Sequence, residues 1–541
     1  MNNPSNKLPH IIIFNPDSWR GDVMGHLGTQ GAVTPNLDRM VEEDGISLKY
    51  SFCQNPVCTP SRCSYFTGWY PHVRGHRTMH HMLHPERGEP NLLAILKEAG
   101  YFVWWSGKND LVPGQDAAKP DLGLDLYCDV KFEPTREDWI RWNRSSMSFE
   151  DPWRGEPGSD TYYSFMEGKR KTPAEMIAEF DDGDDDDDDD IPGYGDRDWG
   201  CVLGACDFIR EYKGDKPLCI VITIGYPHPA YRVEEPYFSM IDRSAIEPPV
   251  PKPGTTNDDW VNAKKPSLLM EITNRQNLRS WTEDRWIELK AVYFGMCARV
   301  DDQFGLVMKA LKDRQIYDDS LVFMFSDHGD FTGDFGLVEK TQNTFEESMV
   351  RVPFVIKPPS WTPCNPGIRE ALVELVDFPA TVYDIAGIKP NYWHFGKSLK
   401  HLFKRDEQHR DAVFCEGGRL KGEYQAMERE STSAGSTSGL YWPRISLQTT
   451  EWKDPSTPMY HTKATMCRTG RYKYVMRLYE SDELYDLEND PGETTNLIDD
   501  EGCLGILHEM ERRLLRHYME TCDVVPMETD SRGLIMEKKK D

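Results

Sequence analysis

The sequence predicts an α/β fold with a large mixed, mostly parallel sheet flanked by helices, followed by a smaller C-terminal α+β subdomain. Short apolar runs alternate with helical segments over the first 400 residues, which favours parallel strands covered on both faces. After about residue 400 the chain changes to short strands and one final helix. We therefore expect one large domain at residues 1–400 and a smaller unit at residues 401–541, in keeping with the length of 541 residues.

The first strand is predicted at residues 11–14, where three isoleucines and a phenylalanine form a short buried run. We expect it to end at Asn15 and Pro16, because proline cannot donate a hydrogen bond in a central ladder. A helix at residues 35–43 follows, with Thr34 as its N-cap and three apolar side chains on one face.

The alternation of helix and strand then continues along the chain. Helices are predicted at residues 91–98, 202–212 and 283–313, and the strands that follow them at residues 101–105, 218–224 and 321–325. In parallel sheets, active groups collect at the carboxyl ends of the strands. The chemistry is therefore expected directly after Phe14, Trp105, Ile224 and Phe325.

Two further segments complete the layout. Residues 150–200 are polar and contain nine aspartates at positions 181–182 and 184–190. Because a block of like charges repels itself, we expect a solvated acidic loop insertion, with calcium buffering or partner docking as alternatives. The C-terminal subdomain is expected to have strands at residues 412–415, 463–468 and 472–477 and a helix at residues 504–518.

The charge balance excludes several classes of partner. The chain has 63 lysines and arginines against 90 aspartates and glutamates, a formal net charge of −27. This excess argues against binding to nucleic acid and against docking on an anionic membrane. No leader with an apolar core stands at the N-terminus, no run of about 18 apolar residues occurs, and the 13 cysteines form no paired framework. We therefore expect a cytoplasmic protein.

The segment from Cys58 to Gly68, CTPSRCSYFTG, carries the strongest chemical signal. Ser61 could cap a short helix whose N-terminus holds Cys58 close to unpaired backbone N–H groups, a suitable place for an anion. Arg62 adds a guanidinium suited to tetrahedral oxyanions. On residue chemistry alone, Cys58 could be a thiolate nucleophile, as in a protein-phosphatase-like enzyme, or an inert buried thiol.

This segment resembles the signature of the type I, formylglycine-dependent sulfatases, which belong to the alkaline phosphatase superfamily. The residues shared with that signature are Cys58, Pro60, Arg62, Thr67 and Gly68. The resemblance implies an alkaline-phosphatase-like fold. It also implies that a formylglycine-generating enzyme oxidises Cys58 to formylglycine, which is the catalytic nucleophile in this family.

Candidate metal ligands follow two of the predicted strands. Asp17 lies after the first strand, and Asp327 and His328 lie after the strand at residues 321–325. Carboxylates at such positions suit a hard divalent cation. The resemblance to sulfatases implies one metal, usually Ca²⁺ with Mg²⁺ or Mn²⁺ as alternatives, held by these residues beside Cys58. Many relatives have an acid or glutamine where this chain has Ser18, so either water completes the shell or Ser18 coordinates directly.

Three further groups resemble family residues that handle the sulfate ester. Lys108 resembles the sulfate-binding lysine, and Lys340 resembles a second lysine that contacts the sulfate and the bridging oxygen. His228 resembles the histidine that protonates the leaving oxygen, a role that suits an imidazole. Relatives often have histidine where this chain has Asp110, which we carry over only as a substrate-binding candidate.

A group of histidines follows the cysteine signature at positions 72, 76, 80, 81 and 84. Because no cysteine or carboxylate partners recur at ligand spacing, zinc is disfavoured and a polar substrate pocket is preferred. We nominate His76 and His81 as substrate-binding residues.

Together these residues predict the hydrolysis of a sulfate monoester, with a small sulfated saccharide or another small organic sulfate as substrate. A phosphonate monoester hydrolase or phosphodiesterase of the same superfamily is the nearer alternative, because the stretch from Asp17 to Asp22 also resembles those enzymes. A binding protein whose Cys58 is never converted is the more distant one. The sequence leaves the oligomeric state open.

Overall fold

The computed structural model describes residues 7–79, 81–113, 122–128, 197–229, 231, 233, 236–276, 278–279, 281–420 and 462–527. The aspartates at positions 181–190, nearly all of the acidic insertion and His80 therefore lie outside the described residues. Within the described part of the chain, no helix has the length and apolar character needed to cross a membrane.

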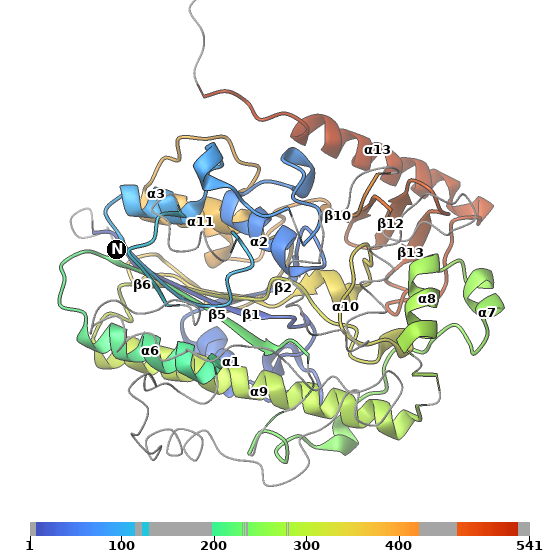
Figure 1. Cartoon of the computed structure of the whole chain (residues 1–541), viewed down its shortest axis with the longest axis horizontal. Helices are drawn as coiled ribbons and strands as arrows, with labels where there is room; N and C mark the ends of the chain where they lie inside the picture. Colours follow the sequence, from blue (N-terminus) through green and yellow to red (C-terminus); the bar gives the residue numbers. More distant parts are fainter. Residues whose placement is uncertain are drawn as a thin grey trace, which may run out of the picture.

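A nine-stranded sheet forms the centre of the molecule (Figure 1). The strands follow the order β4-β3-β5-β1-β6-β8-β2-β7, and β9 pairs with β2. The five strands from β4 to β6 are parallel, whereas β8 is antiparallel to both of its neighbours. The predicted mixed, mostly parallel sheet is therefore confirmed. Its strands are β1 (His10–Asp17), β2 (Ile46–Phe52), β3 (Phe102–Gly107), β4 (Leu126–Cys128), β5 (Leu218–Pro227), β6 (Ser320–Phe325), β7 (Arg351–Val352), β8 (Phe354–Lys357) and β9 (Gly367–Glu374).

Strand β1 is longer than predicted, because it continues through Pro16 to Asp17. Its pairing with β6 ends at Phe14, and only β5 pairs with the last residues, with a register shift between Pro16 and Asp17. Pro16 has no N–H, but no hydrogen bond between β1 and β6 is lost, because the two strands no longer pair at this point. The extension carries Asp17 to the end of the strand.

Helices cover both faces of the sheet (Figure 1). Alternate residues of β1 point to opposite faces. Ile11 and Ile13 pack with the helices of one layer, and Ile12 and Phe14 pack with those of the other. The first layer contains α2 (Cys58–Thr67), α3 (Leu92–Glu98) and α11 (Asp377–Ala386), and the second contains α1 (Pro35–Glu43), α6 (Arg197–Glu211) and α9 (Glu283–Asp313). The helices predicted between residues 35 and 313 are confirmed, although α6 begins five residues early.

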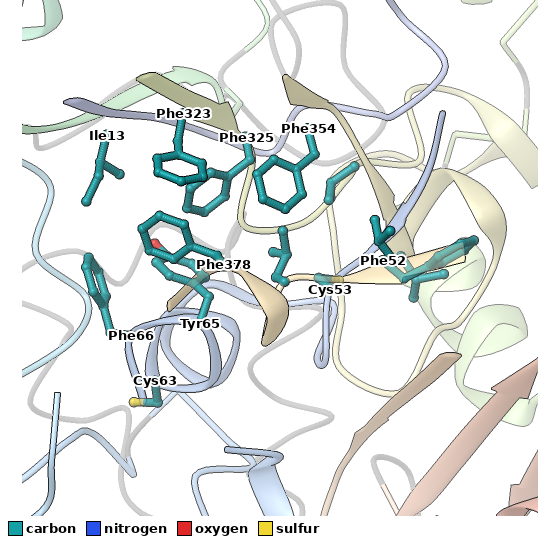
Figure 2. Close-up of a cluster of buried hydrophobic side chains, with 14 of the residues drawn as sticks. Ile13, Phe52, Cys53, Cys63, Tyr65, Phe66, Phe323, Phe325, Phe354 and Phe378 are labelled. Atoms are coloured by element: carbon teal, nitrogen blue, oxygen red, sulfur yellow. The ribbon is translucent and has the colours of Figure 1, made fainter. Parts of the chain in front are cut away.

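Aromatic side chains fix helix α2 on the sheet (Figure 2). The ring of Tyr65 lies 5.0 Å from that of Phe325, which ends β6. Phe378 of α11 lies 4.8 Å from Phe323 and 5.0 Å from Phe325. Because edge-on aromatic packing is both apolar and directional, these contacts set the position of α2 relative to the strand ends.

A four-stranded antiparallel sheet and one helix form the C-terminal subdomain (Figure 1), which confirms the predicted α+β unit and adds a fourth strand to it. One face, including Cys415 and Met466, joins the core of the main sheet, and the other packs on the C-terminal helix through Leu514. The two sheets thus share a core, and the boundary at residue 400 stays a prediction. The elements are β10 (Val413–Gly417), β11 (Ala464–Arg468), β12 (Tyr472–Arg477), β13 (Glu483–Asp486) and α13 (Leu504–Thr521). The helices α7 (Asn257–Asn262), α8 (Ser267–Gln276) and α10 (Glu347–Val350) lie in the connections before it.

The N-terminus of α1 is capped by a residue that the local sequence does not reveal. Thr34 occupies the N-cap position as predicted, but its side chain makes no capping bond and donates to Asp38 instead. Asp301 of α9 accepts the N–H groups of Asn36 and Leu37, at 2.9 and 2.8 Å. A carboxylate at this place also interacts favourably with the helix dipole.

We expect Asp301→Ala to lower the free energy of unfolding by about 2 kcal/mol, because two buried N–H groups of α1 lose their acceptor. Urea denaturation followed by far-UV circular dichroism measures this change. Asp313→Ala is the matched control, since Asp313 lies on the same helix, is exposed and forms a surface pair with Lys309. Equal losses in both variants would contradict the capping role of Asp301.

Candidate active site

Four neighbouring strand ends and the first turn of α2 meet at one place. Strands β3, β5, β1 and β6 lie side by side and parallel, so their carboxyl ends share one edge of the sheet. The candidate residues at or just after these strand ends are, in the same order, Lys108, His228, Asp17, and Asp327 with His328. Cys58 is the first residue of α2.

Asp17 faces α2 because it is the fourth residue of the alternating set that starts at Ile11. The chain then turns sharply at Ser18, whose φ of 68° lies in the left-handed region. Tyr293 of α9 holds this turn: its hydroxyl donates to the Ser18 carbonyl at 2.6 Å and accepts from the Arg20 N–H at 2.9 Å. The sequence did not predict a role for Tyr293, because a tyrosine inside a long amphipathic helix carries no motif.

The loop after β6 brings Asp327 and His328 beside Asp17. It is held at Gly329, whose N–H donates to the carbonyl of Met349 at 2.8 Å. A Cβ at Gly329 would lie 1.9 Å from the Ser348 carbonyl oxygen, so only glycine fits. His328 Nδ1 donates to the Gly329 carbonyl at 2.8 Å, which leaves the lone pair of Nε2 for the cluster.

Helix α2 begins at Cys58, with Val57 at the N-cap position. The expectation that Ser61 caps this helix is therefore wrong, because Ser61 lies in its first turn. Its hydroxyl donates to the backbone carbonyl of Asp327 at 2.6 Å. Ser61 thus joins the start of the helix to the loop that carries Asp327 and His328.

Four buried side chains form a cluster suited to a metal ion. Ligand atoms of Asp17, Cys58, Asp327 and His328 all lie within 4.8 Å of one another. The Cys58 Sγ atom is 3.2 Å from His328 Nε2 and 3.8 Å from an Asp17 oxygen. Burial lowers the pKa of His328 to about 4, so the imidazole is neutral at pH 7 and can donate a lone pair. Two carboxylates and one neutral imidazole fit a divalent cation.

Ser18, the residue that departs from the family pattern, supports a carboxylate of this cluster. Its hydroxyl donates to an Asp17 oxygen at 2.9 Å, and its N–H donates to Asp327 at 3.3 Å. Direct coordination by Ser18 stays a prediction.

Three cations surround the carboxylates. One Arg62 nitrogen lies 3.2 Å from Asp17 and 2.9 Å from Asp327, and all three side chains are fully buried. Lys108 and Lys340 lie 2.7 and 3.4 Å from Asp17. Burial alone would raise the pKa of Asp17, but the charges of the two lysines outweigh it and hold that pKa well below its usual range. This part of the site is therefore arranged to hold oxyanions.

Lys108 and Asp110 form the more open edge of the site. Gly107 precedes them with a φ of 103°, and a Cβ there would lie 1.8 Å from the Thr223 carbonyl oxygen. The Lys108 ammonium is 3.0 Å from Asp110, and these two side chains keep 23% and 25% of their exposure. Burial opposes ionisation of Asp110, but Lys108 and Arg62 outweigh it and lower its pKa. Asp110 is thus a carboxylate beside the predicted sulfate-binding lysine.

His228 reaches the same region from the end of β5. Its Nδ1 atom donates to the carbonyl of Pro229, so Nε2 is the nitrogen that can exchange a proton with a bound molecule. The ring is 9% exposed, and its charge contributes to the low pKa of Asp17.

Lys340 arrives on a loop that folds back after β6. The Phe331 N–H donates to the carbonyl of Glu339 at 3.1 Å, which returns the chain to the strand end. Arg20 fixes this loop through an ion pair of 2.9 Å with Asp334. The contact between Arg20 and Asp334 therefore helps to shape the loop that carries Lys340.

The nominated histidines contact their own segment. His76 Nδ1 donates to the carbonyl of His81 at 2.8 Å, and its Nε2 lies 3.4 Å from Glu89. His72 pairs instead with Glu416 of the C-terminal subdomain, at 2.5 Å. Substrate binding by His76 and His81 stays a prediction.

A known protein family matches most of this chain. The family model described as Sulfatase matches residues 9–388, which include every residue of the site. The chain belongs to the sulfatase family. The predicted family and the prediction of an enzyme are therefore confirmed.

Known sulfatases resemble the chain along most of its length. The choline-sulfatase of Rhizobium meliloti (strain 1021) is 23% identical over 539 residues, covering 98% of this chain and 90% of the relative. The arylsulfatase of Clostridium perfringens (strain 13 / Type A) is 24% identical over 508 residues, covering 91% of each. The crystal structure of the phosphonate monoester hydrolase of Agrobacterium radiobacter superposes with a TM-score of 0.66 at 22% identity, covering 95% of this chain and 96% of that one. This last likeness shows the shared fold.

The lowered pKa of His328 makes a pH-dependent contribution to stability. Between pH 6.5 and 4 the unfolded imidazole binds a proton that the buried one refuses, so stability falls as the pH falls. We expect metal-free protein to lose about 2 kcal/mol more between pH 6.5 and 4.5 than its His328→Asn variant. Urea denaturation in EDTA measures the difference. His508→Asn on the surface of α13 is the control, and a His328→Asn protein with the wild-type loss would refute this contribution.

Proposed function

We propose that this sulfatase-family protein hydrolyses sulfate monoesters of small organic compounds, with formylglycine made from Cys58 as its nucleophile. The observation that carries this proposal is the position of Cys58. Its sulfur lies 3.2 Å from His328 and 3.6 Å from Lys108, beside two carboxylates that Arg62 bridges. A nucleophile at this point faces both a metal-binding cluster and groups that bind oxyanions.

Each group of side chains would have a separate role in this reaction. Arg62, Lys108 and Lys340 would stabilise the negative charge on the sulfuryl oxygens as the ester bond breaks. His228 would give a proton to the departing oxygen. Asp17, Asp327 and His328 would hold a divalent cation, which when bound supplies a Lewis acid that polarises the ester and activates the nucleophile.

The donor set bears on the identity of this metal. The two carboxylates suit Ca²⁺, the ion implied by the family resemblance, whereas imidazole is a donor that suits transition metals. The mixed set therefore fits Mn²⁺ as well as Ca²⁺. Elemental analysis of the native protein distinguishes these ions.

An unmodified Cys58 is a poor nucleophile in these surroundings. Burial and the neighbouring Asp17 raise the pKa of the Cys58 thiol to about 12. The thiolate that a phosphatase-like reaction needs is therefore scarce at pH 7 unless the metal offsets this effect. Conversion to an aldehyde hydrate removes the need to ionise a thiol, which supports the formylglycine proposal.

Cys58→Ala should abolish sulfate release, lowering kcat by about 10³-fold or more, because no other group can replace the nucleophile. Peptide mass analysis of the native protein should show that Cys58 has exchanged H₂S for one oxygen. Cys63→Ala is the matched control, since this second buried thiol of α2 lies near the carbonyl of Leu111 and outside the cluster. An intact thiol at Cys58 in active native protein would refute the modification. An intact thiol in native protein without activity would instead support the binding-protein alternative.

The phosphonate monoester hydrolase alternative uses the same residues, so it must be tested by rate. The stretch from Asp17 to Asp22 resembles those enzymes as well. The values of kcat/KM for 4-nitrophenyl sulfate, bis(4-nitrophenyl) phosphate and 4-nitrophenyl phenylphosphonate decide the question. We expect the sulfate ester to be the best substrate, and a preference for the phosphonate would replace the sulfatase proposal.

The net charge of −27 predicts a preference for small substrates with one or two sulfates. Long polyanions are repelled by the acidic surface, and salt weakens this repulsion. We therefore expect kcat/KM for a sulfated polysaccharide to rise several-fold between about 0.05 and 0.3 M NaCl, while that for a sugar whose single charge is one sulfate changes little. A polymer that is the better substrate at low salt would contradict this preference.

A further inference from the structure

The turn that carries His228 is held by a carboxylate outside the site. Asp198, in the first turn of α6, is 3% exposed and accepts two consecutive backbone N–H groups. One of its oxygens accepts from Gly225 and the other from Tyr226, both at 2.8 Å. These two hydrogen bonds fix the position and the direction of the backbone at the end of β5.

Arg299 of α9 packs against the same turn. Its guanidinium nitrogen lies 3.8 Å from Asp198, and its Cζ atom lies 4.0 Å from the centre of the Tyr226 ring. The side chain is fully buried. Arg299 therefore balances the buried charge of Asp198 and stacks on the aromatic residue of the turn.

Because His228 lies in this turn, the fixed backbone also restricts the position of its imidazole. The His228 N–H donates to the carbonyl of Gly225 at 2.8 Å, which closes the turn three residues after the clamped position. The ring is then oriented by its Nδ1 bond to the carbonyl of Pro229. Asp198 thus lies two hydrogen bonds away from the imidazole, with Gly225 as the shared residue.

We infer that Asp198, together with Arg299, is a positioning pair for the acid His228. The inference rests on the proposed function, in which a hydroxyl of hydrated formylglycine gives its proton to a carboxylate of the cluster and its oxygen bonds to sulfur. The bond from sulfur to the leaving oxygen breaks in the same step. The electron pair stays on the leaving oxygen, which takes the proton of His228 Nε2. Asp198 exchanges no proton and contacts no substrate; it keeps Nε2 within hydrogen-bond reach of that oxygen.

When proton delivery is impaired, the loss of rate depends on the leaving group. When the structure is disturbed in general, the loss of rate is the same for all leaving groups. An alkoxide is a poor leaving group and needs the proton, whereas 4-nitrophenolate departs without it. Displacing His228 should therefore slow alkyl sulfates far more than 4-nitrophenyl sulfate. The aryl ester also reports whether the nucleophile and the metal cluster are intact.

The test compares Asp198→Asn with the wild type on 4-nitrophenyl sulfate and on an alkyl sulfate. The amide keeps one acceptor but presents an N–H₂ group to the other backbone N–H, so the clamp is lost with little change in volume. We expect kcat on the alkyl sulfate to fall by about 10- to 100-fold, with a change below about 3-fold on the aryl sulfate and little change in either KM. Asp207→Asn is the matched control, because Asp207 lies on the same helix and pairs with Arg210.

His228→Ala provides the reference for the complete loss of the acid. If it shows the leaving-group effect and Asp198→Asn does not, the positioning role is overturned while the proposed function stands. If Asp198→Asn slows both esters equally, its role is structural and the inference fails. If the wild type cleaves neither ester, the proposed function itself fails. If His228→Ala affects both esters alike, only the proposed role of His228 fails, and in either case the inference falls with it. Arg299→Lys, which keeps the charge but loses the flat stacking surface, should give the same pattern to a smaller extent.

Discussion

The neutralisation of two buried carboxylates is the constraint on which the rest of the structure depends. Asp17 and Asp327 lie together without exposure to water, where like charges are costly. One nitrogen of Arg62 bridges them, and this arginine comes from α2. The position of α2 therefore decides whether the pair can exist, and the aromatic contacts of Tyr65 and Phe378 with β6 hold the helix there.

The same helix places the proposed nucleophile. Arg62 and Cys58 are four residues apart, which brings them to one face of α2 about one turn apart. When Arg62 engages the two carboxylates, Cys58 is brought next to His328 and Lys108. Charge compensation and the placement of the reactive group are thus two results of one packing arrangement. This geometry explains why Cys58 and Arg62 are four residues apart in the signature.

The sequence was sufficient for the alternating helices and strands that lead into the site, because each of them has a clear hydrophobic period and clear breaks. It also located the cluster, since the carboxyl ends of parallel strands must converge. It did not predict β2, β4 or the strands from β7 to β9. It was wrong at Pro16 and Ser61, and although it placed Thr34 correctly at the N-cap of α1, it did not reveal the residue that caps this helix. The three causes are alike. The pairing of β1 beyond Phe14, the cap supplied by Asp301 and the acceptor at Asp327 all depend on residues more than 200 positions away. Local propensity holds no information about such partners.

The acidic surface and the cationic centre are compatible because they act over different distances. Exposed charges are screened within about 8 Å at physiological salt, so the surface influences approach more than binding. Inside the site each cation is already balanced by a carboxylate: Arg62 by Asp17 and Asp327, Lys108 by Asp17 and Asp110, and Lys340 by Asp17. A sulfate ester would therefore meet lysine and arginine side chains that are held in place in advance. Because these cations are positioned before the ester binds, their reorganisation adds little to the barrier. The carboxylates that hold them thus contribute to catalysis indirectly, although they carry the same charge as the substrate.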